Sequence, residues 1–179
     1  DHAGRLAAHC LDAPITRFAA PLLGGRFTYA ALAVRAPFAF PMPTVVEAAQ
    51  RMGRGRSSPS TRAFLLLGRT VDSSVSPWML RKAFADAGRD LISLPWSLDD
   101  VRPALEAIRR FDWAGAAVTM PFKEQVLDWV RRGGGDLLES AVSVGSANTV
   151  LWRDGRFTAA NTDVGGLLDT LGEEPPLAL

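Results

Sequence analysis

The chain has 179 residues, 47% of them hydrophobic and 22% charged, which is enough apolar sequence for one folded domain or one domain with part of another. Twenty lysines and arginines against 19 acidic residues give a formal charge of +1, which argues against a dedicated nucleic-acid or membrane-surface binder. No apolar run approaches the roughly 20 residues of a membrane span, and the N-terminus lacks a signal-peptide layout. We therefore expect a cytoplasmic protein.

Cysteine and histidine are too scarce for several kinds of catalytic site. The single cysteine, Cys10, has no partner for a disulfide or a CxxC pair. The histidines are His2 and His9, so the sequence after residue 10 excludes Ser-His-Asp, Cys-His and histidine–metal schemes. We expect no metal site.

A change of composition divides the chain near residue 60. Residues 51–61 are rich in glycine, serine, proline and arginine, which is typical of a solvated linker. The segment before it, residues 1–50, is predicted to contain two strands and one helix, at Arg5–Leu11, Arg26–Leu32 and Val45–Met52. Two strands do not make an independent sheet in water, so we expect this segment to be a remnant of a larger domain.

Strands and helices alternate in residues 62–179. Apolar runs predict strands at 63–67, 91–96 and 113–119, and an Asp154-Gly155 turn predicts a hairpin of 148–152 with 157–160. Helices are predicted from the N-cap Ser76 to Ala87 with an apolar face, from the N-cap Ser97 to Arg110, and at 121–132, 136–144 and 163–171. This order favours an α/β fold, with a mostly parallel open sheet and helices on both faces.

Polar side chains gather where the predicted strands end, which is where open α/β sheets bind ligands. They are Ser74 and Ser76 after the first strand, Thr119 and Lys123 after the third, and Asn148 and Asp163 at the ends of the hairpin. Each also has a structural interpretation, because serine and aspartate cap helices, asparagine closes turns, and a lysine is often a solvated surface group. The glycines 133–135 fit a helix end and not a phosphate loop, because no Gly-Lys-Ser/Thr or GxGxxG unit follows a strand there.

Four motifs in order give the sequence a family resemblance. Ser74-x-Ser76-Pro77, Gly115-x-x-Val118-Thr119-x-Pro121-x-Lys123, Gly145-x-x-Asn148-Thr149 and Asn161-Thr162-Asp163-x-x-Gly166 resemble the N-terminal, substrate-binding domain of shikimate dehydrogenase over residues 62–172. The resemblance implies that Lys123 and Asp163 form the catalytic acid–base pair. It also implies that the substrate's carboxylate and hydroxyls are bound by Ser74, Ser76, Thr119 and Asn148.

The implied reaction is the NADPH-dependent reduction of 3-dehydroshikimate to shikimate, with quinate left open as a second substrate and NAD as a second cofactor. No residue of this chain is expected to bind NADP, because the family's nicotinamide-binding domain would begin after residue 172. We therefore expect the isolated chain to bind substrate and to be inactive by itself.

The chain departs from the family pattern at four positions. Leu80 and Arg81 stand where the family usually has His-Asn, Ala117 where it has Asn or Ser, and Phe122 where it often has His. These departures leave an alternative open, a non-catalytic shikimate- or quinate-binding regulatory protein or pseudo-enzyme. The intact Lys123 and Asp163 favour the enzyme, because a sensor needs no proton donor.

The N-terminal segment has a resemblance of its own. Thr16-Arg17, Leu23-Gly24-Gly25-x-Phe27-Thr28-Tyr29-Ala30 and Ala36-Pro37 resemble the last two strands of a type I 3-dehydroquinate dehydratase, which is a β/α barrel. Arg17 matches the family's substrate-carboxylate arginine, whereas Arg35 and Ala39 interrupt its Ser-Ala-Pro-Gly-Gln loop. The resemblance implies a bifunctional fused polypeptide, without dehydratase activity in these residues.

Overall fold

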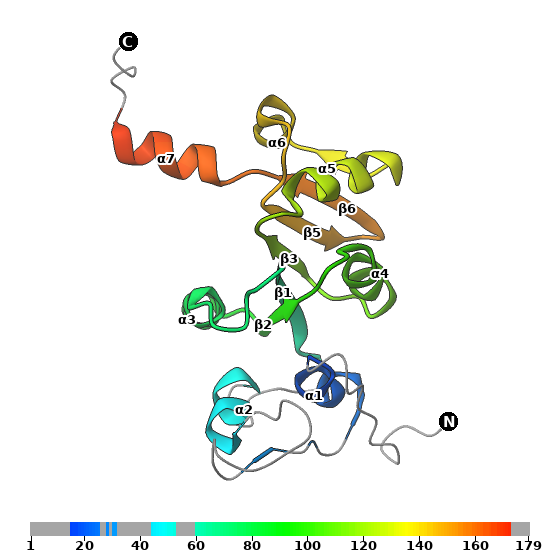
Figure 1. Ribbon diagram of the computed structural model, residues 1–179, viewed down its shortest axis with the longest axis vertical. Helices are drawn as coiled ribbons and strands as arrows, with labels where there is room; N and C mark the ends of the chain where they lie inside the picture. Colours follow the sequence, from blue (N-terminus) through cyan, green and yellow to red (C-terminus); the bar gives the residue numbers. More distant parts are fainter. Residues whose placement is uncertain (1–14, 26–27, 29, 32–43, 53–59, 173–179) are drawn as a thin grey trace.

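The computed structural model describes residues 15–25, 28, 30–31, 44–52 and 60–172 (Figure 1). Its centre is a six-stranded sheet with the strand order β2-β1-β3-β5-β6-β4. The strands are β1 (Arg62–Gly68), β2 (Leu91–Ser97), β3 (Gly115–Val118), β4 (Asp136–Leu137), β5 (Thr149–Arg153) and β6 (Arg156–Ala160). β1 pairs in parallel with β2 and β3, β4 pairs in parallel with β6, and β5 is antiparallel to both β3 and β6. The predicted α/β fold with a mostly parallel open sheet is thus confirmed.

Seven α-helices and one 3-10 helix accompany the sheet in the described residues. They are α1 (Thr16–Ala19), η1 (Ala20–Leu23), α2 (Val45–Met52), α3 (Ser76–Asp86), α4 (Arg102–Arg110), α5 (Lys123–Arg132), α6 (Glu139–Val144) and α7 (Asp163–Leu171). α3 and α4 lie to either side of the β1–β2 end of the sheet (Figure 1). The chain runs from β1 through α3 to β2, and then from β2 through α4 past β1 to β3. Because connections between parallel strands are right-handed, this reversal of direction places the two helices on opposite faces of the sheet.

The core is centred on β1 and on the helices that cover it. Leu65 and Leu67 are fully buried, and they share one hydrophobic cluster with Leu105 and Ile108 of α4 and Leu127 of α5. Burying a leucine side chain contributes about 2 kcal/mol, so this cluster is a main source of the fold's stability. The continuous apolar run of β1 predicted this burial on both faces.

The hairpin of β5 and β6 forms as its turn residues predict. Asp154 and Gly155 join the strands with φ angles of 52° and 76°. Two successive positive φ values are those of a type I′ turn, which aspartate and glycine tolerate best. The turn sets a register in which Thr149 lies opposite Ala160.

The starts of α3 and α4 differ from the prediction. The side chain of Ser76 does not cap α3, because Ser76 is itself the first helical residue and its N–H donates to Ser74 Oγ at 3.2 Å. Ser97 does not cap α4 but ends β2, where its hydroxyl accepts from the Val71 N–H and donates to Asp72. α4 starts later, at Arg102, whose N–H donates to Asp100 Oδ1 at 3.0 Å.

The predicted helix 136–144 is shorter than expected, because Asp136 and Leu137 pair with β6 as the short strand β4. α6 therefore begins only at Glu139. The predicted apolar face of α3 is also largely wrong. Met79, Ala83 and Ala87 are exposed, and from that face only Leu80 and Phe84 are half-buried, Phe84 with its ring edge-on to Phe64.

The two predicted N-terminal strands lie mostly outside the described residues, as does most of the predicted linker. Ala31 is one of the three residues described from Arg26–Leu32, and it forms an isolated bridge with Thr44. The predicted helix Val45–Met52 is present as α2. Ile15, Phe18 and Ala48 belong to the same hydrophobic cluster as the sheet. None of the described helices is both long and apolar enough to cross a membrane.

Candidate functional site

Lys123 and Asp163 lie side by side although 40 residues separate them. Lys123 is the first residue of α5, which follows β3, and Asp163 is the first residue of α7, which follows β6. The Lys123 ammonium donates to Asp163 Oδ2 at 2.6 Å, an ion pair with a hydrogen bond. The contact forms because β3, β5 and β6 are neighbours in the sheet, so the turns that follow β3 and β6 reach one another across β5.

Asn148 joins this pair from the start of β5. Its amide N–H donates to Asp163 Oδ1 at 2.7 Å and to Thr162 Oγ1 at 3.0 Å. Its carbonyl oxygen accepts from the backbone N–H of Thr162 at 2.9 Å and from the Thr149 hydroxyl at 3.0 Å. Each oxygen of the Asp163 carboxylate therefore accepts a hydrogen bond, Oδ1 from Asn148 and Oδ2 from Lys123.

Asn161 fixes the backbone on which Asp163 stands. It is buried, and its amide donates to the carbonyl oxygen of Ser146 at 3.0 Å and to its hydroxyl at 3.1 Å. Its own side-chain oxygen accepts from the Asp163 N–H at 3.0 Å. Buried amide groups of this kind are costly to leave unpaired, so the start of α7 is firmly tied to the loop before β5.

The neighbours of Asp163 favour its charged form. The hydrogen bond from Lys123 lowers the pKa of the Asp163 carboxyl most, and the hydrogen bond from Asn148 and the charge of Lys123 lower it further, while burial acts in the opposite direction. The side chains of Lys123 and Asp163 are 31% and 57% exposed, so a ligand can reach both. The pair thus offers an ammonium donor beside an ionised carboxylate.

Thr119 reaches the same edge of the sheet. It follows β3, and its N–H donates to the carbonyl oxygen of Leu67 at 2.8 Å. Its methyl group lies against Gly68, where a Cβ atom would stand only 2.5 Å from Thr119 Cγ2. Gly68 therefore lets the ends of β1 and β3 approach closely, with the Thr119 side chain partly exposed beside them.

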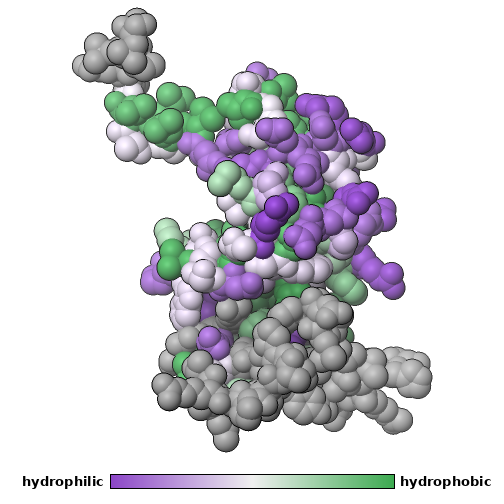
Figure 2. Space-filling model, viewed as in Figure 1, coloured by the Kyte–Doolittle hydropathy of each residue, from purple (hydrophilic) through white to green (hydrophobic). Residues whose placement is uncertain are grey.

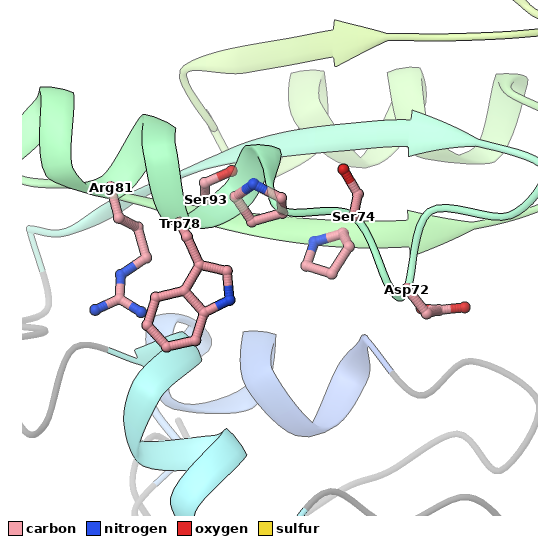
Figure 3. A pocket seen from close by; sticks show the side chains of 7 residues that line it. Asp72, Ser74, Trp78, Arg81 and Ser93 are labelled. Carbon is pink, nitrogen blue, oxygen red and sulfur yellow. The ribbon is translucent and has the colours of Figure 1, made fainter.

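Ser74 and Ser76 lie on the other side of this edge, Ser74 in the turn between β1 and α3 and Ser76 as the first residue of α3. Ser74 lines a small pocket with Trp78, Arg81 and Ser93, and Figure 3 shows its hydroxyl standing apart from the Trp78 and Arg81 side chains. No hydrogen bond in the described residues joins either serine to Lys123 or Asp163. Figure 2 shows the surface notched between α3 and α7.

The four departures from the expected pattern have separate places in the structure. Phe122 is 1% exposed and packs in the core just before α5, while Ala117 is half-buried on β3 between Leu66 and Thr149. Leu80 is half-buried on α3. On the same helix the Arg81 guanidinium lies 5.4 Å from the centre of the Trp78 ring.

The glycines 133–135 do not form a dinucleotide-binding turn. A dinucleotide site needs free backbone N–H groups in a glycine-rich turn between a strand and a helix. The N–H groups of residues 133–135 instead donate to the carbonyl oxygens of Trp129, Arg131 and Val130 at the end of α5. The interpretation of these glycines as a helix end is confirmed.

Sequence reasoning gave no individual role to Asn161, Thr162 or Ser146. The first two stood inside a quoted motif, but their roles depend on contacts between β6, α7 and the loop before β5. The available signal was an asparagine directly after an apolar strand, where burial demands partners for its amide.

Comparison with known protein families shows a match over residues 66–150 to the family described as shikimate dehydrogenase substrate binding domain. Curated relatives include the shikimate dehydrogenase (NADP(+)) of Pelobacter propionicus, 31% identical over 124 residues, which are 68% of this chain and 43% of that protein. The protein of the same name from Alkaliphilus metalliredigens is 34% identical over 116 residues, 64% of this chain and 39% of its own.

Solved structures agree in fold. The shikimate 5-dehydrogenase of Listeria monocytogenes, in complex with shikimate and NAD, is 29% identical with a TM-score of 0.59, over 65% of this chain and 39% of that one. The Thermus thermophilus enzyme in complex with NADP(H) and shikimate is 32% identical with a TM-score of 0.53, over 62% and 41%. The chain spans about two fifths of the length of the curated relatives it matches.

Proposed function

We propose that this chain contains a shikimate dehydrogenase substrate-binding domain, which binds shikimate and 3-dehydroshikimate and supplies the acid–base half of their interconversion. The observation that carries the proposal is the contact of Lys123 with Asp163 at 2.6 Å. Two residues of opposite charge, far apart in the sequence and both accessible to solvent, meet where ligands bind in open α/β sheets.

The chemistry of the pair fits a ketone reduction. The carbonyl oxygen of 3-dehydroshikimate becomes a hydroxyl group and takes up a proton, which we assign to the Lys123 ammonium as general acid. Asp163 holds the ammonium in place and has a carboxylate that can accept a hydrogen bond from a ring hydroxyl. Asn148 keeps that carboxylate oriented.

Ser74, Ser76, Thr119 and Asn148 are proposed to bind the substrate. Hydroxyl and amide groups suit a ligand with several hydroxyls and one carboxylate, because they donate and accept hydrogen bonds without adding charge. The serines lie at the start of α3, where the helix N-terminus favours a negative charge.

The hydride donor is proposed to be NADPH bound by residues outside this chain. The relatives named above are NADP-dependent by name, whereas the glycines 133–135 here form a helix end and not a dinucleotide-binding turn. We accordingly propose that the isolated chain binds substrate without reducing it.

The test is a calorimetric titration of shikimate into the whole chain, beside Asp163→Ala and the control Asp169→Ala. Asp169 lies on the same helix and is exposed, so its removal changes the charge equally without touching the pair. Binding that disappears in Asp163→Ala and persists in Asp169→Ala supports the proposal. A folded chain that binds no shikimate contradicts it.

A regulatory shikimate- or quinate-binding protein is the second candidate, favoured by Ala117, which is half-buried on β3 and offers no polar side chain where the resemblance expects Asn or Ser. The two candidates predict different activities for the longest natural polypeptide that contains this sequence. That polypeptide interconverts shikimate and 3-dehydroshikimate with NADP if the first is right, and Lys123→Ala abolishes this activity. It binds the ligand without turnover if the second is right.

We further propose that residues 1–50 derive from a type I 3-dehydroquinate dehydratase barrel and that the natural polypeptide is a cytoplasmic fusion. The support is the order of motifs around Thr16-Arg17 and Leu23-Gly24-Gly25. Sequencing the transcript upstream of Asp1 tests the idea, because a fusion requires the remaining barrel strands to be encoded there.

A further inference from the structure

A second hollow lies at the opposite end of α5 from Lys123. It has a volume of about 410 Å³ and is bounded by α4, the C-terminal end of α5 and the β5–β6 hairpin. Since α5 has ten residues, the two ends are separated by roughly 15 Å. The hollow is therefore distinct from the site proposed above.

Aromatic rings line one part of this hollow. Trp129 and Trp152 both line it and are partly exposed, and both pack against Phe157, with ring centres 5.1 Å and 4.7 Å from the Phe157 ring. The glycines 133–135 line it as well, and having no side chains they leave the space open. Such rings offer a flat ligand an apolar face.

Arginine side chains line the rest of the hollow. Arg109, Arg132 and Arg156 line the hollow, against Glu106 as the one acidic residue. Glu106 pairs with Arg109, and Arg156 pairs with Asp136 at 3.1 Å. Arg132 is exposed and has no hydrogen bond or ion pair with any described residue. Figure 2 shows hydrophilic side chains gathered over this α4–α5 side of the molecule.

We propose that this hollow binds an organic anion that carries an aromatic ring, with the ring against Trp129 and Trp152 and the anionic group on Arg132. Its volume is in the range of small-molecule sites, which typically combine apolar walls with a few polar groups. A guanidinium without a carboxylate partner binds a phosphate or carboxylate without breaking an existing ion pair. This proposal does not depend on the binding of shikimate.

The five tryptophans provide the measurement. Naphthyl phosphate is titrated into the whole chain while the indole N–H signals are followed by ¹H–¹⁵N NMR. Each signal is assigned from a variant in which one tryptophan is replaced. We expect saturable shifts of the Trp129 and Trp152 signals and none of Trp78, which lies on α3. Naphthol, which has only the ring, and inorganic phosphate, which has only the charge, should each bind at least about fivefold more weakly.

The matched variants are Arg132→Gln and Arg89→Gln, each of which removes one exposed positive charge. Arg89 lies just after α3 and does not line the hollow. Arg132→Gln should weaken naphthyl phosphate binding about five- to tenfold, and Arg89→Gln should leave it unchanged. Equal binding by Arg132→Gln and the parent chain, equal shifts at Trp78, or equal affinity for naphthol would each overturn the proposal.

Discussion

The Asn148 amide donates to one oxygen of the Asp163 carboxylate at 2.7 Å, while the Lys123 ammonium donates to the other at 2.6 Å. Asn148 therefore orients the carboxylate that pairs with Lys123. This relationship leads to the first two predictions.

Replacing Asn148 with alanine should weaken shikimate binding about tenfold or more. The change frees Asp163 Oδ1 and leaves the Thr162 N–H without its acceptor, and each lost hydrogen bond removes about 0.5–1.5 kcal/mol. Calorimetry measures the effect. Unchanged affinity in a folded Asn148→Ala chain would show that this amide neither binds substrate nor orients Asp163.

Replacing Lys123 with methionine should raise the pKa of the Asp163 carboxyl, because the hydrogen bond from Lys123 is the largest cause of its lowering. The carboxyl ¹³C shift followed against pH measures this change. A lowered folded-state pKa stabilises the fold above the ordinary aspartate pKa of about 3.9, and that stabilisation is lost as the pH falls through the folded-state pKa. Between those pH values the parent chain should therefore lose a small stability increment that is smaller in the variant, where the Asn148 hydrogen bond still lowers the Asp163 pKa.

Replacing Phe122 with histidine should destabilise the fold and should not strengthen substrate binding. Phe122 is 1% exposed, so Phe122→His places a polar ring in the core, at a cost of about 1–3 kcal/mol. Urea unfolding compares it with Phe111→His, where the parent side chain is 41% exposed and little change is expected. Equal stabilities of the two variants would contradict the buried position of Phe122.

The glycines after α5 should respond differently to alanine. At Gly135 a Cβ atom would lie 2.6 Å from Val130 Cγ1 and 2.7 Å from the Phe157 carbonyl oxygen, so Gly135→Ala should cost about 1–3 kcal/mol. At Gly133 the nearest atom is 3.4 Å away and φ is −78°, so Gly133→Ala should be neutral or slightly stabilising. Thermal unfolding of both variants checks the contrast, which disappears if Gly135 is not packed against β6.

The sequence by itself determined five of the six strands of the sheet, the hairpin and the strand ends that carry polar residues, whereas β4 was predicted as part of a helix. The apolar run of β1 and the Asp154-Gly155 turn are local signals, because burial on both faces and positive φ angles restrict which residues fit. Motif order likewise identified Lys123 and Asp163 before any contact between them was known.

Only the tertiary structure decided which of these residues meet. The sequence predicts Ser97 as a helix cap, yet Ser97 is the last residue of β2, because that strand pairs with β1 up to Gly68. The α3 face reads as core, yet Met79 is 68% exposed. Asn161 gains its role from Ser146, which the β5–β6 pairing brings beside it. Hydrophobic periodicity reports how a segment prefers to fold, whereas contacts between segments depend on strand order and register, which no local pattern encodes.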